Sequence, residues 1–115
     1  MEARPELLAW LLVGHLAGDY LFQTAWMAEG KAGRWLPLFL HSAVYTLCIV
    51  IVSLPVGGLS PRGVLVIFLA HLVLDQRRLV AWWAGKICRA DQHSWLGVMI
   101  DQSWHALVLA LASLL

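Results

Sequence analysis

Four long apolar stretches, separated by short polar links, dominate the hydropathy pattern of the chain. They cover about residues 6–25, 36–54, 62–83 and 95–115. A helix needs about 20 residues to cross a hydrocarbon core of about 30 Å. The pattern therefore predicts an all-α fold, a four-helix transmembrane bundle, with residues 1–115 forming one four-span membrane domain.

The composition supports a membrane protein and argues against a nucleic-acid partner. The chain has 115 residues, of which 61% are hydrophobic and 13% charged, whereas soluble domains carry about 25% charged residues. The net charge is only +1 and no basic run is present. The two cysteines, Cys48 and Cys88, form no disulfide framework, so we expect free thiols.

The distribution of basic residues predicts the orientation in the membrane. Short links impose an up-down-up-down order, in which one side holds Lys31, Arg34, Arg77, Arg78, Lys86 and Arg89, and the other holds only Arg4 and Arg62. By the positive-inside rule the first side faces the cytoplasm, so both termini should lie outside it. The apolar N-terminal stretch runs on without a small-residue cleavage site, which predicts a retained first span rather than a signal peptide.

Histidine and aspartate recur four residues apart in three of the apolar stretches. The pairs are His15/Asp19, His71/Asp75 and, in reversed order, Asp101/His105. Residues four apart share one face of a helix. Because the fourth helix runs in the opposite direction to the first and third, the reversed order places the three histidines at one depth. The three aspartates then lie one turn nearer the cytoplasm, together with His41 from the second stretch.

Ionisable side chains inside a membrane are costly and usually functional, which favours a metal site. Aspartate with histidine suits zinc, manganese or iron(II), and the histidine content favours zinc. Seven ligands exceed what one tetrahedral ion needs, so we expect two divalent ions bridged by an aspartate or a hydroxide. The predicted ligands are His15, Asp19, His41, His71, Asp75, Asp101 and His105. The alternative is that the pairs are hydrogen-bonded contacts between helices with no metal.

Further polar residues lie close to this set in the sequence. Gln23 and Tyr45 share faces with the ligands and could orient a ligand or contact a substrate. Arg77 and Arg78 follow Asp75 and could hold a phosphate or carboxylate, or extend to lipid headgroups. Gly14 and Gly18 form a small-residue pair that would let another backbone approach.

These motifs resemble a known family. The segments 14–28 (GHLAGDYLFQTAWMA), 40–41 with Tyr45, 71–75 and 100–105 are similar to those of a bacterial and phage family of small membrane proteins, domain of unknown function 3307. The resemblance implies a multi-pass protein of the bacterial inner membrane and implies no activity. Gln76-Arg77-Arg78 departs from the tyrosine- or lysine-containing sequence expected there. A looser similarity, to membrane-bound metal-dependent hydrolases, is one of analogy.

Together these features predict a metal-dependent hydrolase that acts from the cytoplasmic side on an amphiphilic substrate, a lipid-linked phosphoester or ester. Asp75 and Asp101 are the predicted catalytic residues, and Arg77, Arg78, Gln23 and Tyr45 the predicted substrate contacts. The alternatives are a divalent metal-ion transporter and a metal-stabilised, non-catalytic membrane subunit. The expected partners are the lipid bilayer and the small-molecule substrate, and homo-oligomerisation is left open.

Overall fold

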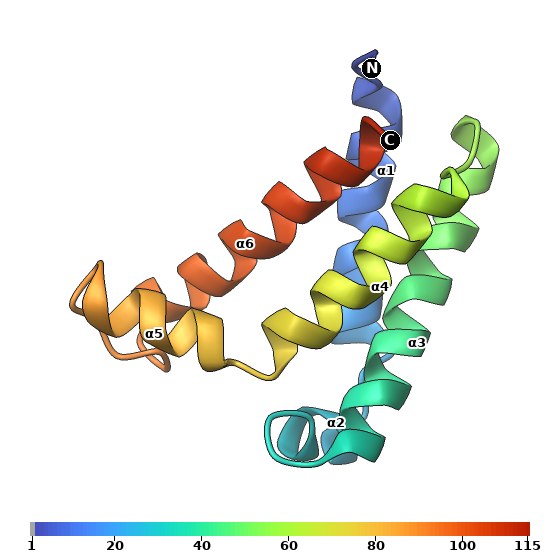
Figure 1. Ribbon diagram of the computed structural model, residues 1–115. Coiled ribbons are helices and arrows are strands. Elements are labelled where there is room, and N and C mark those ends of the chain that lie inside the picture. Colours follow the sequence, from blue (N-terminus) through green and yellow to red (C-terminus); the bar gives the residue numbers. More distant parts are fainter. Residues whose placement is uncertain (1) are drawn as a thin grey trace.

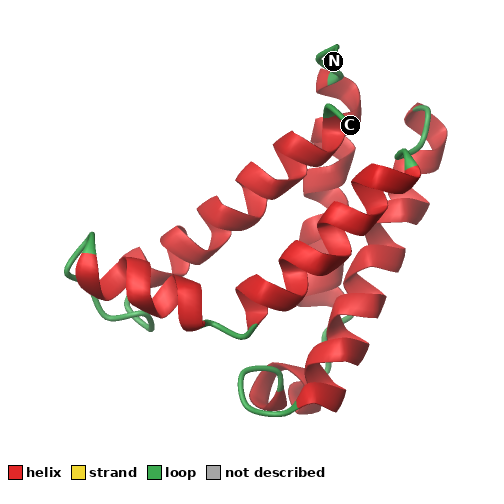
Figure 2. Cartoon of the chain, in the orientation of Figure 1, coloured by secondary structure: helices red, strands yellow, loops and turns green. Residues whose placement is uncertain are grey.

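The computed structural model describes residues 2–115, and this range contains helices and no strand (Figures 1 and 2). The elements are α1 (Pro5–Leu16), η1 (Ala17–Leu21), α2 (Ala25–Gly30), α3 (Trp35–Ser53), η2 (Leu54–Val56), α4 (Pro61–Asp75), α5 (Arg78–Lys86) and α6 (Trp95–Ser113). The prediction of an all-α fold is confirmed.

Four of the helices pack as a closed ring. Helix α1 packs against α3 and α6, and α4 packs against the same two helices. Within the described range, no Cα atom of α1 lies within 8 Å of one in α4, and none of α3 within 8 Å of one in α6, so the diagonal pairs meet only through side chains such as Tyr45 and His105. Both termini lie at one end of the ring together with the turn that follows α3, whereas α2 and the link from α4 to α5 lie at the opposite end (Figure 1). All four helices therefore contribute side chains to one shared interior.

Two of the helices are long and apolar enough to cross a membrane. These candidate spans are Trp35–Val56 and Trp95–Ser113. Helix α4 has 15 residues, which at 1.5 Å per residue gives a length of only about 22 Å. The structure thus supports two candidate membrane helices. The predicted arrangement with four spans stays a proposal.

The first and third apolar stretches are interrupted where the sequence pattern predicts continuous helix. The first continues from α1 into the π-helix η1 and breaks after Leu21. The third ends as α4 at Asp75, and Arg77 then adopts a left-handed conformation with φ 69°. That conformation cannot continue a right-handed helix. Helix α5 therefore leaves at an angle to α4 (Figure 1), and the stretch predicted over 62–83 is two helices.

The apolar core is divided by the polar residues of the ring. One cluster, nearer the termini, contains Leu7, Leu11, Tyr45, Ile49, Ile67, Leu109 and Ala112. A second cluster, formed by α4, α5 and α6, contains Leu74, Val80, Ala84 and Ile100. His71 lies between these clusters along α4, as His105 does along α6. The buried polar groups thus occupy a layer between two apolar ones.

Close approach of α1 and η1 to α3 depends on two glycines. A Cβ atom built on Gly14 would lie 2.9 Å from the Ile49 Cα atom, and one built on Gly18 would lie 2.9 Å from the Tyr45 Cα atom. The predicted packing role of this pair is confirmed. Gly18 directly precedes Asp19, so the same contact sets how far the Asp19 carboxylate reaches into the ring.

Replacing Gly18 by alanine should destabilise the protein. The added methyl group would meet the backbone of α3, and such overpacking typically costs about 1–3 kcal/mol. Gly85→Ala on α5 is the matched control, because a Cβ atom added there would meet no described atom within 4 Å and alanine is the better helix former. Thermal unfolding in detergent should show a lower Tm for Gly18→Ala alone. An unchanged Tm would mean that η1 does not depend on this contact.

Candidate metal centre

All seven predicted ligands are buried in the interior of the ring. They come from α1, η1, α3, α4 and α6, and are His15, Asp19, His41, His71, Asp75, Asp101 and His105. Six of them form two overlapping groups whose ligand-type atoms lie within 4.8 Å of one another. The structure therefore brings six of the seven together from separate helices, and their role as ligands stays a prediction.

The first group joins Asp19, His41, His71 and Asp75. The His41 Nε2 atom lies 3.1 Å from Asp19 Oδ1 and 2.9 Å from Asp75 Oδ2. The His71 Nε2 atom lies 3.3 Å and 3.4 Å from the same two oxygens. Two imidazole nitrogens and two carboxylate oxygens thus converge on one small volume, a donor set that suits zinc.

The second group joins Asp75, Asp101 and His105. The His105 Nε2 atom lies 3.1 Å from Asp75 Oδ1, the carboxylate oxygen that the first group does not use. On its other side, His105 Nδ1 lies 3.4 Å from Asp101 Oδ1. Asp75 is thereby shared, with one oxygen turned toward each group.

The contacts of His105 require positive charge between its ring and Asp75. Its Nδ1 lies 2.7 Å from the backbone carbonyl of Asp101, which can only accept a hydrogen bond, so Nδ1 carries the proton. A neutral His105 then presents the lone pair of Nε2 to a carboxylate oxygen of Asp75. Two acceptors 3.1 Å apart attract each other only with a positive charge between them, either a second proton on the ring or a metal ion.

The π-helix η1 places Asp19 at the centre of the cluster. Single π-helical turns occur frequently at functional sites. The backbone carbonyl of Asp19 accepts a hydrogen bond of 2.7 Å from Gln23 Nε2, so Gln23 stabilises the end of η1. The Gln23 Oε1 atom is buried and has no hydrogen-bond partner among the described residues.

His15 lies beside the cluster but belongs to neither group. Its Nδ1 atom is 2.8 Å from the Tyr45 hydroxyl, its Nε2 atom is 2.6 Å from Gln102 Oε1, and Asp19 Oδ2 is 3.7 Å away. The Tyr45 ring also stacks on His71, with ring centroids 3.8 Å apart. Tyr45 therefore contacts two histidines. The role of His15 as a ligand stays a prediction.

Two cationic side chains reach the carboxylates. Lys31 Nζ lies 3.0 Å from Asp75 Oδ2, and Arg77 Nη1 lies 3.3 Å from Asp101 Oδ2. The Arg77 guanidinium also donates to the Gln92 side chain and backbone carbonyl, at 3.3 Å and 3.2 Å. Both arginines are predicted substrate contacts. In the structure Arg77 is paired with Asp101 and Gln92, whereas Arg78 is exposed.

Sequence reasoning missed three residues of the site: Lys31, Ser42 and Gln102. Ser42 contacts His71 Nδ1 at 3.0 Å, and Gln102 contacts His15. Each directly follows a predicted ligand in the sequence, and this neighbourhood could have indicated that they lie near the site. Lys31 lies in a link outside the apolar stretches, and no pattern in the sequence connects it to Asp75.

These features define an all-helical protein with a buried aspartate–histidine cluster that could hold a metal ion. A family model described as "Protein of unknown function (DUF3307)" matches residues 7–115, so the chain belongs to this family and the predicted resemblance is confirmed. Comparison with curated proteins and with solved structures finds no match.

Proposed function

We propose that the chain is a multi-pass protein of the bacterial inner membrane that binds two divalent metal ions, zinc above all, and hydrolyses an amphiphilic lipid-linked phosphoester or ester. The observation that carries this proposal is the position of Asp75. One oxygen lies against His41 of α3 and His71 of α4, and the other lies against His105 of α6. A carboxylate in that position is suited to bridge two ions.

The surface of the ring supports the membrane location. Only 33% of each candidate membrane window is buried inside the protein, whereas the core helix of a soluble protein is mostly buried. Large apolar side chains are exposed on every long helix, for example Leu16, Leu47, Leu65 and Leu107. Exposed Trp26, Trp35, Trp82 and Trp95 belong to α2, α5 and the first residues of α3 and α6. Tryptophan at one end of a bundle is typical of an interfacial belt.

A hydrolytic reaction fits the chemistry of the residues. Bound divalent ions would lower the pKa of a water molecule and polarise the bond to be broken. Asp101 Oδ1 is a buried oxygen with no hydrogen-bond partner among the described residues. It is our candidate for the general base that accepts a proton from water. Arg77, bound to Asp101 Oδ2, fixes the orientation of that carboxylate.

The apolar layer near the termini favours a hydrolase over a transporter. Leu7, Leu11, Ile49, Ile67 and Leu109 are almost completely buried and fill the ring between the polar cluster and the termini. An ion would have to cross this layer without a carboxylate or imidazole ligand among the described residues. Access from the opposite end, where α2 lies, is enough for a hydrolase (Figure 1).

Metal analysis should separate a metal centre from hydrogen-bonded packing. Wild-type protein purified in detergent and dialysed against Zn²⁺ should retain two ions per chain. Asp75→Asn should lose both, because Asp75 is common to the two groups, and Asp101→Asn should lose one. Asp91→Asn is the matched control, since Asp91 is exposed and outside both groups. Equal zinc content in wild type and Asp75→Asn would contradict the proposal.

Turnover of a lipid phosphate should depend on the same residues. Zinc-loaded protein should release phosphate from dioctanoyl phosphatidic acid in mixed micelles, and release should stop when zinc is removed by a chelator. Asp101→Asn should lower kcat by a factor of at least about 10², because it removes the candidate general base and also one of the two ions, whereas Asp91→Asn should keep the activity.

An ester substrate, dioctanoyl phosphatidylcholine, covers the second substrate class in the same assay. Zinc binding without turnover of either lipid, together with zinc flux into proteoliposomes, would instead establish a transporter. Zinc binding with neither activity would contradict the hydrolase and leave a metal-stabilised membrane subunit.

A further inference from the structure

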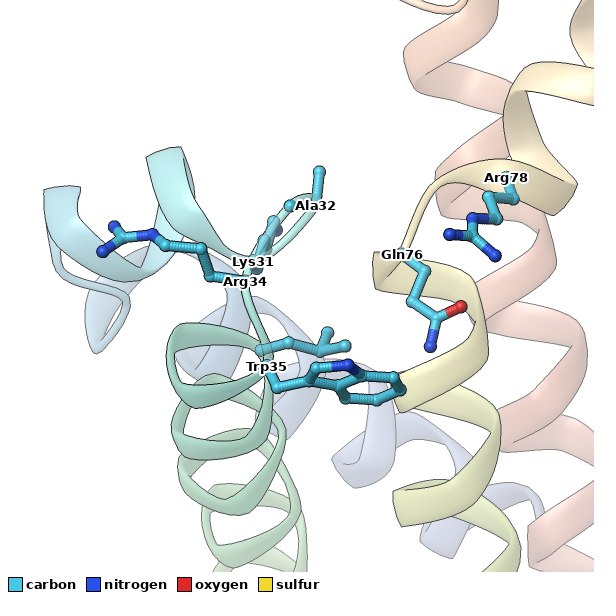
Figure 3. Close-up of a pocket in the computed structure, with 8 residues that line it drawn as sticks. Lys31, Ala32, Arg34, Trp35, Gln76 and Arg78 are labelled. Carbon is cyan, nitrogen blue, oxygen red and sulfur yellow. The ribbon is translucent and has the colours of Figure 1, made fainter.

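A small basic pocket opens at the end of the ring that carries α2. It has a volume of about 90 Å³ and is lined by Lys31, Ala32, Gly33, Arg34, Trp35, Leu38, Gln76 and Arg78. Trp35 extends across from α3 toward α4, and Gln76 and Arg78 lie on the facing side (Figure 3). The guanidinium of Arg34 is turned away from this space and lies 5.7 Å from the Trp26 ring centroid. The lining thus contains three cationic residues and no acidic one.

Lys31 belongs both to this pocket and to the metal centre. It lines the pocket, and its ammonium lies 3.0 Å from Asp75 Oδ2. Only 15% of the Lys31 side chain is exposed, and only 2% of the Asp75 side chain. Asp75 Oδ2 is the same oxygen that lies 2.9 Å from His41 Nε2 in the first ligand group. The Lys31 ammonium therefore contacts the same carboxylate oxygen that a metal ion in the first group would bind.

Lys31 and a metal ion should compete for Asp75. A buried carboxylate without a partner is costly, so Lys31 can leave only when another cation replaces it. A divalent ion bound to Asp75 would also repel the ammonium across a distance of a few ångströms. Lys31 sits in the turn after α2, on a long flexible side chain, and the pocket beside it offers room.

Formal charges support such an exchange. The cluster contains three carboxylates, Asp19, Asp75 and Asp101, and two cations, Lys31 and Arg77. With neutral histidines, one negative charge remains, which is less than two divalent ions require. Release of Lys31 leaves two negative charges for the metal ions to neutralise. It also frees the Lys31 ammonium to act together with Arg78 in the pocket.

We propose that Lys31 is an exchangeable cation that leaves Asp75 when a divalent ion binds and then, with Arg78, holds a phosphate group of the substrate in this pocket. The inference rests on the proposed function and assigns the substrate's phosphate group to the basic pocket beside Lys31. Arginine provides paired N–H donors that match a phosphate oxyanion, and lysine adds a mobile point charge. Metal binding would thereby prepare the pocket for the substrate.

Chemical labelling of the wild-type protein tests the movement of Lys31. The chain has two lysines, Lys31 and Lys86, so Lys86, exposed at the end of α5, is an internal reference. Pulse acetylation with sulfosuccinimidyl acetate, read by mass spectrometry, should modify Lys31 slowly without metal. Saturation with Zn²⁺ should raise the rate at Lys31 by about tenfold relative to Lys86. A rate at Lys31 that zinc leaves unchanged or lowers would overturn the exchange.

The affinities for Zn²⁺ and for inorganic phosphate test the two parts of the proposal separately. In titration calorimetry, Lys31→Met should bind Zn²⁺ about tenfold more tightly than wild type, because the competing cation is gone. The zinc-loaded variant should bind inorganic phosphate about tenfold more weakly, as should Arg78→Met. Lys86→Met removes the same charge at the same end of the ring and should change neither affinity.

The outcomes distinguish this inference from the proposed function. Wild-type protein that binds no Zn²⁺ would refute the metal centre itself and, with it, the exchange. Tight Zn²⁺ binding that Lys31→Met leaves unchanged would refute only the exchange. Stronger zinc binding with unaltered phosphate affinity would refute the assignment of the pocket to the phosphate.

Discussion

Burial of three carboxylates among histidines in an apolar ring is the constraint on which the whole structure depends. A buried carboxylate is stable only next to positive charge or several hydrogen-bond donors. Lys31 and Arg77 each neutralise one carboxylate, and Asp19 has histidine contacts alone. The remaining negative charge, on Asp19, lies within 4.0 Å of imidazole nitrogens from α1, α3, α4 and α6. This arrangement makes the cluster a metal centre in our account rather than a set of packing contacts.

The irregular parts of the helices serve this cluster. The π-helix η1 and the glycine contact at Gly18 bring Asp19 next to α3. The left-handed turn at Arg77 ends α4 directly after Asp75 and carries the Arg77 guanidinium to Asp101. Regular helices on either side hold an apolar layer nearer the termini. The polar site is thereby closed toward the termini by apolar side chains.

Much of the site could be predicted because helical periodicity is a local property of the sequence. The i, i+4 pairs and the reversed order of Asp101 and His105 predicted five of the six clustered residues, and the depth of His41 in the second stretch predicted the sixth. The contact between Lys31 and Asp75 and the hydrogen bonds of His15 were not predictable, because they depend on how α2 and α6 pack. The break at Arg77 was missed for a different reason, since the polar run Asp75-Gln76-Arg77-Arg78 contains no glycine or proline that would mark a turn.

X-ray absorption spectroscopy at the zinc edge of the zinc-loaded protein tests the central claim most directly. The account predicts first-shell scattering from nitrogen and oxygen alone at about 2.0–2.2 Å, with the outer-shell pattern of imidazole. A metal–metal vector of about 3.5–4 Å should also be present. A sulfur shell at about 2.3 Å, from Cys48 or Cys88, or zinc coordinated by water with no imidazole, would contradict it.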